Sequence, residues 1–371
     1  MKNPISATSL FAAAAAATTL LSLTGALAAA PRLQFRADGT FKIVHFTDFH
    51  FYDDGDLDAS SLKVMETVLM LERPDFAVLS GDVVDGTGIS PTTSGAKFYR
   101  YEYNKIASVL TKYGVPWALT LGNHDTGGPL TREEIVAVDQ SFNNSMTQRG
   151  PATATGGVTN YYLPIYARDG ASVAYLLWML DVSEGLAGGC EGYPGDDCVT
   201  RDIVEWYANT SAAINKGRET PIDAFMFTHI PVPEFVDLWN NERCLGSKGE
   251  NICCPQYNTG LFDAIVKAGD VRGLFVGHDH VNDFCGTFEK HPNVTLCYGR
   301  KSGYGEYNPE KHGARIIQLR ADRPGAKVSW ETWIRDELGE VPVLEWHEPT
   351  GPGQLHCGAA GVEHKRKVLL H

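Results

Sequence analysis

The stretch LFVGHDH, residues 274–280, begins as a buried strand does and ends in two histidines. Three apolar residues precede a glycine, and a single residue separates His278 from His280. Residues two apart in an extended backbone point to the same face. The stretch therefore predicts a strand with two imidazoles at its carboxyl end, where ligands gather in open α/β sheets.

Four other apolar runs end in the same way, in the polar clusters TDFH, SGD, LGNHD and TH. The polar side chains of these clusters include Asp48, His50, Asp82, Asn123, His124, Asp125 and His229. Any one of them alone is typical of a helix cap, a turn or a hydrogen-bonded edge histidine. Burying them together without partners would be costly, so the whole set predicts metal coordination.

The candidate ligands comprise two aspartates, one asparagine and four histidines. They are Asp48, His50, Asp82, Asn123, His229, His278 and His280. This set exceeds the needs of one ion and suits two ions that share a carboxylate. Imidazole with carboxylate and one amide oxygen favours first-row ions such as Fe, Mn or Zn over calcium. Asp279 is expected to point away from the ions and to support the site from behind.

Strand and helix patterns alternate from Phe41 onward. FKIVHFTDFH and FAVLSGDVV have strand character, RDIVEWYANTSAAI has helical spacing, and Thr131 with Glu134 forms a capping-box pattern. This alternation predicts an α/β fold, and the shorter β-like runs after His280 are expected to complete a second sheet. We expect one domain over residues 31–335 and an irregular tail over 336–371.

The N-terminus predicts export from the cytosol. Lys2 precedes a charge-free, alanine-rich run that closes on small residues, which is the pattern of a signal peptide over residues 1–30. An uncleaved membrane anchor is the alternative, because the run is about long enough to span a bilayer. A cleaved signal would leave the chain without a stable anchor, secreted or in a compartment such as the vacuole. The sequons at Asn143, Asn209 and Asn293 agree with secretion and predict N-glycans.

The chain has eight cysteines, an even number that suits an oxidising compartment. We predict two disulfides, Cys190–Cys198 across a glycine-rich loop and Cys285–Cys297 across a hairpin. The pairing of the other four is left open by the sequence: Cys244, Cys253, Cys254 and Cys357.

The charge balance limits the classes of molecule that the chain is expected to bind. The 371 residues carry 45 acidic and 32 basic side chains, and this acidic excess argues against general nucleic-acid binding. It does not exclude an anionic substrate, because bound metal ions reverse the local sign.

D-x-H, GD, GNHD, TH and GHDH, in this order and at these separations, resemble the calcineurin-like metallophosphoesterase superfamily over about Phe41–Leu319. GHDHVNDFCG with a second cysteine in LCYG is most similar to its purple-acid-phosphatase-like branch. The resemblance implies a four-layer α/β fold, a double β-sheet sandwich flanked by helices. It also implies that Asp48, His50 and His280 hold one metal. Asn123, His229 and His278 would hold the other, with Asp82 bridging both.

One position departs from the purple enzymes. Those enzymes carry a tyrosine three residues after the bridging aspartate, and its bond to ferric iron gives the colour. Asp85 occupies that position here. Iron, manganese and zinc therefore stay open as the metal.

Two ions at such a site activate water and hold phosphate oxygens. We expect His124 to protonate the leaving oxygen and Asp125 to orient His124, with a helix N-cap as the alternative role for Asp125. The predicted function is a secreted, acid-phosphatase-like phosphomonoesterase acting on a small phosphate ester or a phosphoprotein. A phosphodiesterase or nucleotidase with the same site, and a catalytically silent metal-binding protein, are the alternatives.

Overall fold

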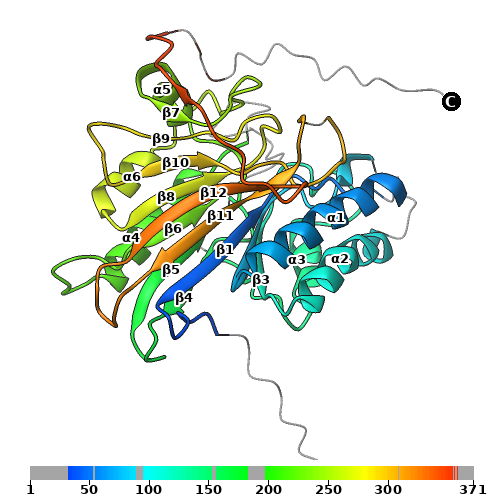
Figure 1. Ribbon diagram of the computed structural model, residues 1–371, viewed down its shortest axis with the longest axis horizontal. Coiled ribbons are helices and arrows are strands. Elements are labelled where there is room, and N and C mark those ends of the chain that lie inside the picture. The colour runs from blue at the N-terminus through cyan, green and yellow to red at the C-terminus, as the bar shows by residue number, and fades with distance from the viewer. Residues whose placement is uncertain are drawn as a thin grey trace, which may run out of the picture. The chain divides into compact units, whose positions relative to one another are not determined.

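The computed structural model describes residues 32–52, 55–88, 95–152, 156–182, 197–307, 309–353, 355 and 357 (Figure 1). The predicted signal peptide, residues 1–30, lies outside them. The chain from Pro31 onward forms one compact unit. No helix in the described part of the chain is both long enough and apolar enough to cross a bilayer.

The first of two mixed sheets has five strands in the order β12-β11-β1-β2-β3. β1, β2 and β3 are parallel, and β11 lies antiparallel to both β1 and β12. The strands are β1 (Thr40–Phe46), β2 (Phe76–Ser80), β3 (Trp117–Thr120), β11 (Gly313–Arg320) and β12 (Ser329–Asp336).

The second sheet has eight strands in the order β13-β7-β9-β10-β8-β6-β5-β4. Its central strands β5, β6, β8 and β10 are parallel, and the outer ones pair antiparallel. The strands are β4 (Tyr161–Tyr166), β5 (Val173–Met179), β6 (Ala224–Phe227), β7 (Cys244–Leu245), β8 (Val271–Val276), β9 (Cys285–Thr287), β10 (Thr295–Tyr298) and β13 (Trp346–His347).

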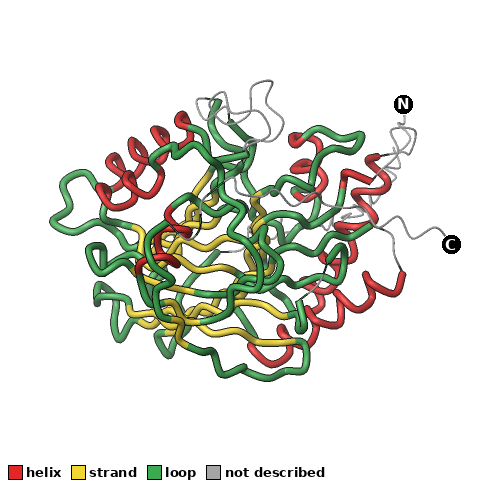
Figure 2. Tube along the Cα trace, turned by 90° about the horizontal axis from the view of Figure 1, so that it is seen from above, coloured by secondary structure: helices red, strands yellow, loops and turns green. Residues whose placement is uncertain are grey.

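Helices cover the outer faces of both sheets, and Figure 2 shows the strands gathered between helices on either side. α1 (Gly55–Glu72), α2 (Gly95–Lys112) and α3 (Arg132–Asp139) lie beside the five-stranded sheet. The eight-stranded sheet carries α4 (Arg201–Ile214), α5 (Glu234–Asn241) and α6 (Leu261–Ala268). The short 3-10 helix η1 (Gly86–Gly88) follows β2. This arrangement confirms the predicted four-layer sandwich.

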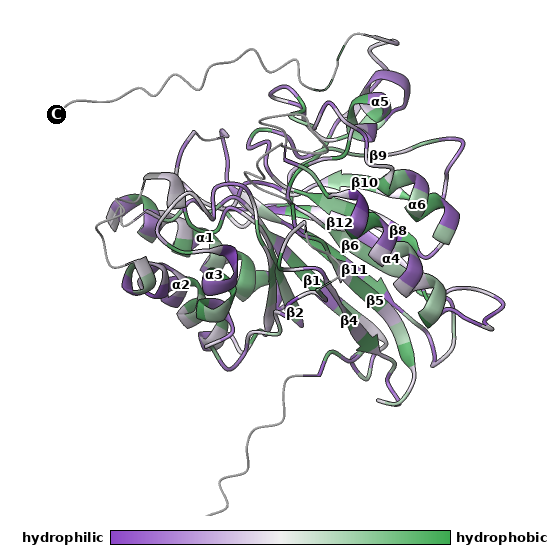
Figure 3. Ribbon diagram, turned by 180° about the vertical axis from the view of Figure 1, so that it is seen from behind, coloured by the Kyte–Doolittle hydropathy of each residue, from purple (hydrophilic) through white to green (hydrophobic). Residues whose placement is uncertain are grey.

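The core follows from the alternation of side chains along the strands. On β1, Phe41 and Ile43 face the layer between the sheets, whereas Val44 and Phe46 pack with the residues under α1 and α2. Apolar residues dominate both sheets, as the hydropathy colouring shows (Figure 3). The sandwich therefore has one apolar layer between its sheets and one beneath each set of helices.

The local predictions hold in part. α4 spans the predicted helix, and the Thr131–Glu134 capping box is present. The late β runs, however, do not all enter a second sheet. β9 and β10 do, whereas β11 and β12 join the five-stranded sheet, where β11 pairs with β1.

The C-terminal segment is tied to the domain more than we expected. The predicted irregular tail from Asp336 contributes the edge strand β13, which pairs with β7. A disulfide joins Cys357 of this segment to Cys254. The segment predicted as an irregular tail therefore includes one short paired strand and one disulfide.

The predicted Cys285–Cys297 disulfide is confirmed and links β9 to β10. Cys190 of the predicted Cys190–Cys198 pair lies outside the described residues. Cys244 and Cys253 are free thiols in the described part of the chain. The sequon residues Asn143, Asn209 and Asn293 are all exposed, so the predicted glycans could be carried at each.

The layer between the sheets predicts a strong dependence of stability on Phe275. Its ring is fully buried, stacks on Phe227 and meets Phe225 edge to face. Phe275→Ala should lower the free energy of unfolding by about 3–5 kcal/mol, because a cavity would replace the ring. Denaturant unfolding measures this loss. The same measurement on Leu338→Ala, an exposed position, should change by no more than about 0.5 kcal/mol.

Candidate metal centre

The five predicted polar clusters follow β1, β2, β3, β6 and β8, and all lie at one end of the sandwich. The Asp48–His50 and His278–His280 pairs follow strands of different sheets, β1 and β8. The two pairs face each other across the layer between the sheets.

The sequence argument assumed an extended backbone at these residues, but the structure shows a left-handed one at four of the candidate ligands. Asp48, His50, Asp82 and His278 have φ values of 57°, 51°, 50° and 73°. Non-glycine residues rarely adopt this left-handed region, and each one there costs about 1–3 kcal/mol. The ligands therefore lie just beyond their strands, on turns that redirect the side chains.

Two glycines permit the close approach of these turns. A Cβ on Gly81 would lie 2.6 Å from His229 Nδ1, and one on Gly122 would lie 2.2 Å from Asp82 Oδ1. Gly81 also has a φ of 95°. The GD and GNHD patterns thus need glycine before the aspartate and the asparagine for steric reasons.

Asp48, His50 and His280 form the first ligand group, and all three are buried. The Nε2 atoms of His50 and His280 are 3.0 Å apart, and His280 Nε2 lies 3.7 Å from Asp48 Oδ1. The other ring nitrogen of His280 lies 3.0 Å from the carbonyl oxygen of Tyr307. This contact directs Nε2 of His280 into the group.

Asp82, His229 and His278 form the second group. His229 Nε2 lies 3.0 Å from Asp82 Oδ2, and His50 Nε2 of the first group lies 3.6 Å from the same oxygen. Asp82 therefore lies between the two groups, in the place that a shared ligand would need.

Several buried polar atoms at the centre lack hydrogen-bond partners in the described residues. Two of them, Asn123 Oδ1 and His229 Nε2, belong to residues that the family resemblance assigns to one ion. The other ring nitrogen of His229 lies 2.8 Å from the carbonyl oxygen of Ser80. Buried polar atoms without partners are rare, and a metal ion would satisfy both. The residues present therefore fit metal binding.

The buried carboxylates create a demand for positive charge. Burial lowers the pKa of His229, but Asp82 and Asp48 outweigh it and raise that pKa to about 9. The same field attracts metal cations, so a proton and an ion compete for His229 Nε2.

Asp125 does not contact the His124 imidazole, which corrects the predicted role. Its buried carboxylate accepts four backbone N–H bonds of 2.7–3.2 Å. The donors are Asp82, Val83, Val84 and Gly122. Asp125 is not the cap of the next helix either, because Thr131 caps α3. It joins the turn after β2 to the turn after β3.

The His124 ring faces two other carboxylates. Its Nδ1 lies 3.5 Å from Asp85 Oδ1 and 3.5 Å from Glu306 Oε1. Burial lowers the pKa of His124, but Asp82, Asp85 and Glu306 raise it to about 10. The sequence analysis noted Asp85 only because it occupies the position of the purple enzymes' tyrosine. It did not identify Glu306.

Asp279 was predicted to support the site from behind, and in the described residues its hydrogen bonds are to residues outside the candidate ligand set. Its carboxylate accepts hydrogen bonds from the Tyr298 hydroxyl and from the backbone N–H of Cys253. Lys301 was not predicted. It is fully buried, and its Nζ donates to the carbonyl oxygen of Asp48 at 3.1 Å. The segment KSGYGEY carries no sequence motif that indicates this contact.

A cavity of about 570 Å³ opens onto the metal centre. His124, Lys248, Glu250, Glu306 and Tyr307 contribute to its wall. The cavity therefore offers substrate access to His124 and to both ligand groups.

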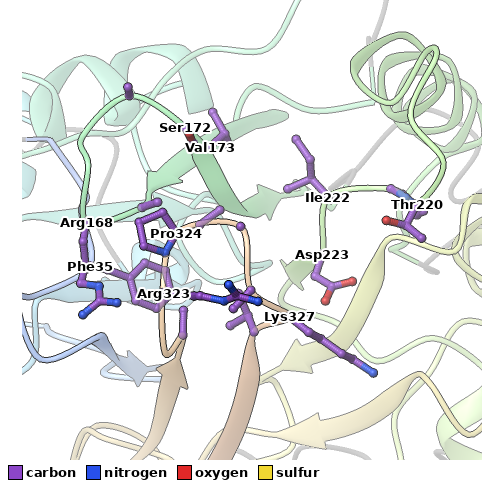
Figure 4. A pocket seen from close by; sticks show the side chains of 18 of the residues that line it. Phe35, Arg168, Ser172, Val173, Thr220, Ile222, Asp223, Arg323, Pro324 and Lys327 are labelled. Carbon is purple, nitrogen blue, oxygen red and sulfur yellow. The ribbon is translucent and has the colours of Figure 1, made fainter.

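A larger hollow, about 950 Å³, lies at the amino ends of β5, β6 and β8 (Figure 4). Arg168, Arg323 and Lys327 line it, and Arg272 there pairs with Asp223. None of the predicted site residues lines it. Size alone is therefore no guide to the candidate site.

The fold and this site define a metallophosphoesterase architecture. The profile of calcineurin-like phosphoesterases matches residues 41–282, and the chain belongs to this family.

Named relatives agree with the predicted branch. The chain is 29% identical to probable inactive purple acid phosphatase 14 of Arabidopsis thaliana over 340 residues, which cover 82% of each chain. It is 27% identical to probable inactive purple acid phosphatase 29 of the same plant, over 85% of this chain and 87% of the relative. Phosphatase DCR2 of Saccharomyces cerevisiae is 27% identical over 73% of this chain and 49% of its own length.

From this geometry we predict that Asp125→Asn lowers stability and metal retention, and that any loss of turnover follows from these. An amide would direct N–H groups at backbone N–H donors, so some of the four hydrogen bonds would be lost. We expect a stability loss of about 1–3 kcal/mol and weaker metal retention through displacement of Asp82. Thermal unfolding and metal analysis measure both. A variant with wild-type stability and metal content but low turnover would contradict this structural role.

Proposed function

We propose that this chain is a phosphoric ester hydrolase, specifically a phosphomonoesterase that works with two bound metal ions. The main observation behind this proposal is that the two ligand groups lie side by side and share Asp82. They lie beneath a cavity of about 570 Å³, which has room for a small ester. Two of the relatives described above are named as probable inactive phosphatases, and the third is named as a phosphatase. These names do not establish whether this chain is active. Every predicted ligand position of this chain is intact, which favours an active enzyme.

The ligand assignment follows the two groups. Asp48, His50 and His280 would hold one ion, and Asn123, His229 and His278 the other, with Asp82 shared. The ions, when bound, would supply an activated water and positive charge for the phosphate oxygens. The identity of the metal, whether Fe, Mn or Zn, is a matter for measurement.

His124 supplies the proton for the leaving oxygen in this proposal. The carboxylates of Asp85 and Glu306 face its Nδ1, which leaves Nε2 available to the substrate. These carboxylates favour the protonated ring that an acid requires. Asp85 thus takes the orienting role that we first gave to Asp125.

We also propose that the protein is secreted or enters the lumen of the secretory pathway. The pattern of residues 1–30 supports this, and so do the disulfides Cys254–Cys357 and Cys285–Cys297. Determining the N-terminal residue of the purified protein would separate cleavage near Ala28–Ala30 from an uncleaved anchor.

Metal content and ester hydrolysis test the proposal together. The purified full chain should contain about two first-row ions and hydrolyse phosphate monoesters faster than diesters. Asp82→Asn should lose most of both ions, because the two groups share this carboxylate. Elemental analysis and an ester panel on the same sample give the result. Chelator-insensitive activity with one ion or none would overturn the dinuclear proposal, and a preference for diesters would make the chain a phosphodiesterase.

His124→Ala should keep both ions and lower turnover roughly 10²–10⁴-fold, the usual contribution of a positioned acid. The loss should be large for alkyl phosphates and small for nitrophenyl phosphate, whose leaving oxygen departs without a proton. Steady-state kinetics on both esters measures the difference. His278→Ala provides the contrast, because loss of a ligand should slow both esters alike. Metal loss in His124→Ala would assign that ring to ligation instead.

A further inference from the structure

The loop from Lys301 to Tyr307 contacts every member of the first ligand group. The Lys301 ammonium and the Gly303 N–H both donate to the carbonyl oxygen of Asp48. The Tyr307 carbonyl oxygen lies 3.0 Å from His280 Nδ1. In the second group, His229 Nδ1 instead lies 2.8 Å from the Ser80 carbonyl oxygen, and the His278 backbone N–H donates to the Asp48 carboxylate. The loop therefore supports the first group directly, and the two groups meet at Asp48.

The loop lies directly against the backbone that carries Asp48 and His50. A Cβ on Gly303 would lie 2.1 Å from the Phe49 carbonyl oxygen, and one on Gly305 would lie 2.1 Å from that of His50. Only glycine permits this approach. The next residue, Glu306, has a φ of 58°, which is unfavourable for glutamate.

Glu306 reaches two imidazoles at once. Its Oε1 lies 3.5 Å from His124 Nδ1, and its Oε2 lies 3.9 Å from His50 Nδ1. Both nitrogens are buried and lack hydrogen-bond partners in the part of the chain that the structure describes. The two rings meet edge to face with centroids 4.9 Å apart. A single carboxylate is therefore placed behind a candidate ligand and behind the candidate acid.

We propose that Glu306 is a positioning residue that supports the Asp48–His50–His280 group through His50 and the proton donor through His124. A carboxylate behind a ligand histidine fixes its ring and raises its basicity, and removing it typically weakens metal binding 10–100-fold. The inference rests on the proposed function. It adds that Glu306 supports the ligands of only one of the two ions. It also adds that Glu306 links that ion to the proton donor His124.

Titration of Mn²⁺ into the metal-stripped full chain tests this directly. Glu306→Gln keeps the side-chain shape and the backbone requirement but removes the charge. We expect one of about two equivalents to bind roughly 10–100-fold more weakly, with the other unchanged. Glu310→Gln removes the same charge from an exposed position four residues on and should leave both affinities unchanged. Thermal unfolding of the stripped proteins checks that the variants fold.

Two further backgrounds identify which ion is affected. In His278→Ala, which damages the second group, Glu306→Gln should still weaken the remaining ion. In His280→Ala, which damages the first group, it should have little further effect, because partners acting on one site are not additive. Equal weakening of both ions, or the reverse dependence on background, would overturn the proposal.

Kinetics provides the second readout. Glu306→Gln at saturating Mn²⁺ should lower kcat more for an alkyl phosphate than for nitrophenyl phosphate, with little change in KM. Identical behaviour of wild type and Glu306→Gln in binding and kinetics would overturn this inference and leave the proposed function intact. A wild-type chain that binds no Mn²⁺ and hydrolyses no ester would overturn both.

Discussion

The constraint on which this structure depends is the burial of Asp48 and Asp82 at one end of the sandwich. Two buried carboxylates in one place are costly unless cations or donors compensate them. Here Lys301 donates to the Asp48 carbonyl, His278 donates its backbone N–H to the Asp48 carboxylate, and His124 does the same for Asp82. These contacts neutralise only part of the charge. The imidazoles of both groups complete the set, and they are also the candidate metal ligands.

The sandwich supplies the rigidity that this arrangement needs. Four of the candidate ligands have left-handed backbones, and such strain persists only where the surroundings hold it. The turns after β2 and β3 are tied by the Asp125 carboxylate, and the turn after β1 is covered by the Lys301–Tyr307 loop. The apolar layer between the sheets fixes where these strands end. Packing in the core thus determines where the candidate ligands lie.

Much of this could be predicted from local sequence. A strand that ends in GHDH or GNHD identifies its own polar residues, so the ligand candidates and the α/β class followed from the pattern. Strand alternation, however, placed His278 and His280 on the same face of an extended strand. The left-handed turn at His278 instead directs it to Asp82 and His229, while His280 joins Asp48. Only the resemblance to a known family assigned the two histidines to different groups.

What the sequence could not predict depends on contacts between distant segments. Asp125 follows His124 directly, and adjacency made it the natural partner of that ring, yet its carboxylate binds the backbone of residues 82–84. Glu306 is 182 positions after His124 and lies in a segment with no apolar period, so nothing local indicated its contact. Charge in a buried site is balanced by whatever the fold brings near, not by what is near in the chain. Of the carboxylates that raise the pKa of His124, Asp82 and Asp85 follow β2, the neighbour of β3 in its own sheet. Glu306 comes instead from the loop between β10 and β11, and only the folded chain brings that loop to His124.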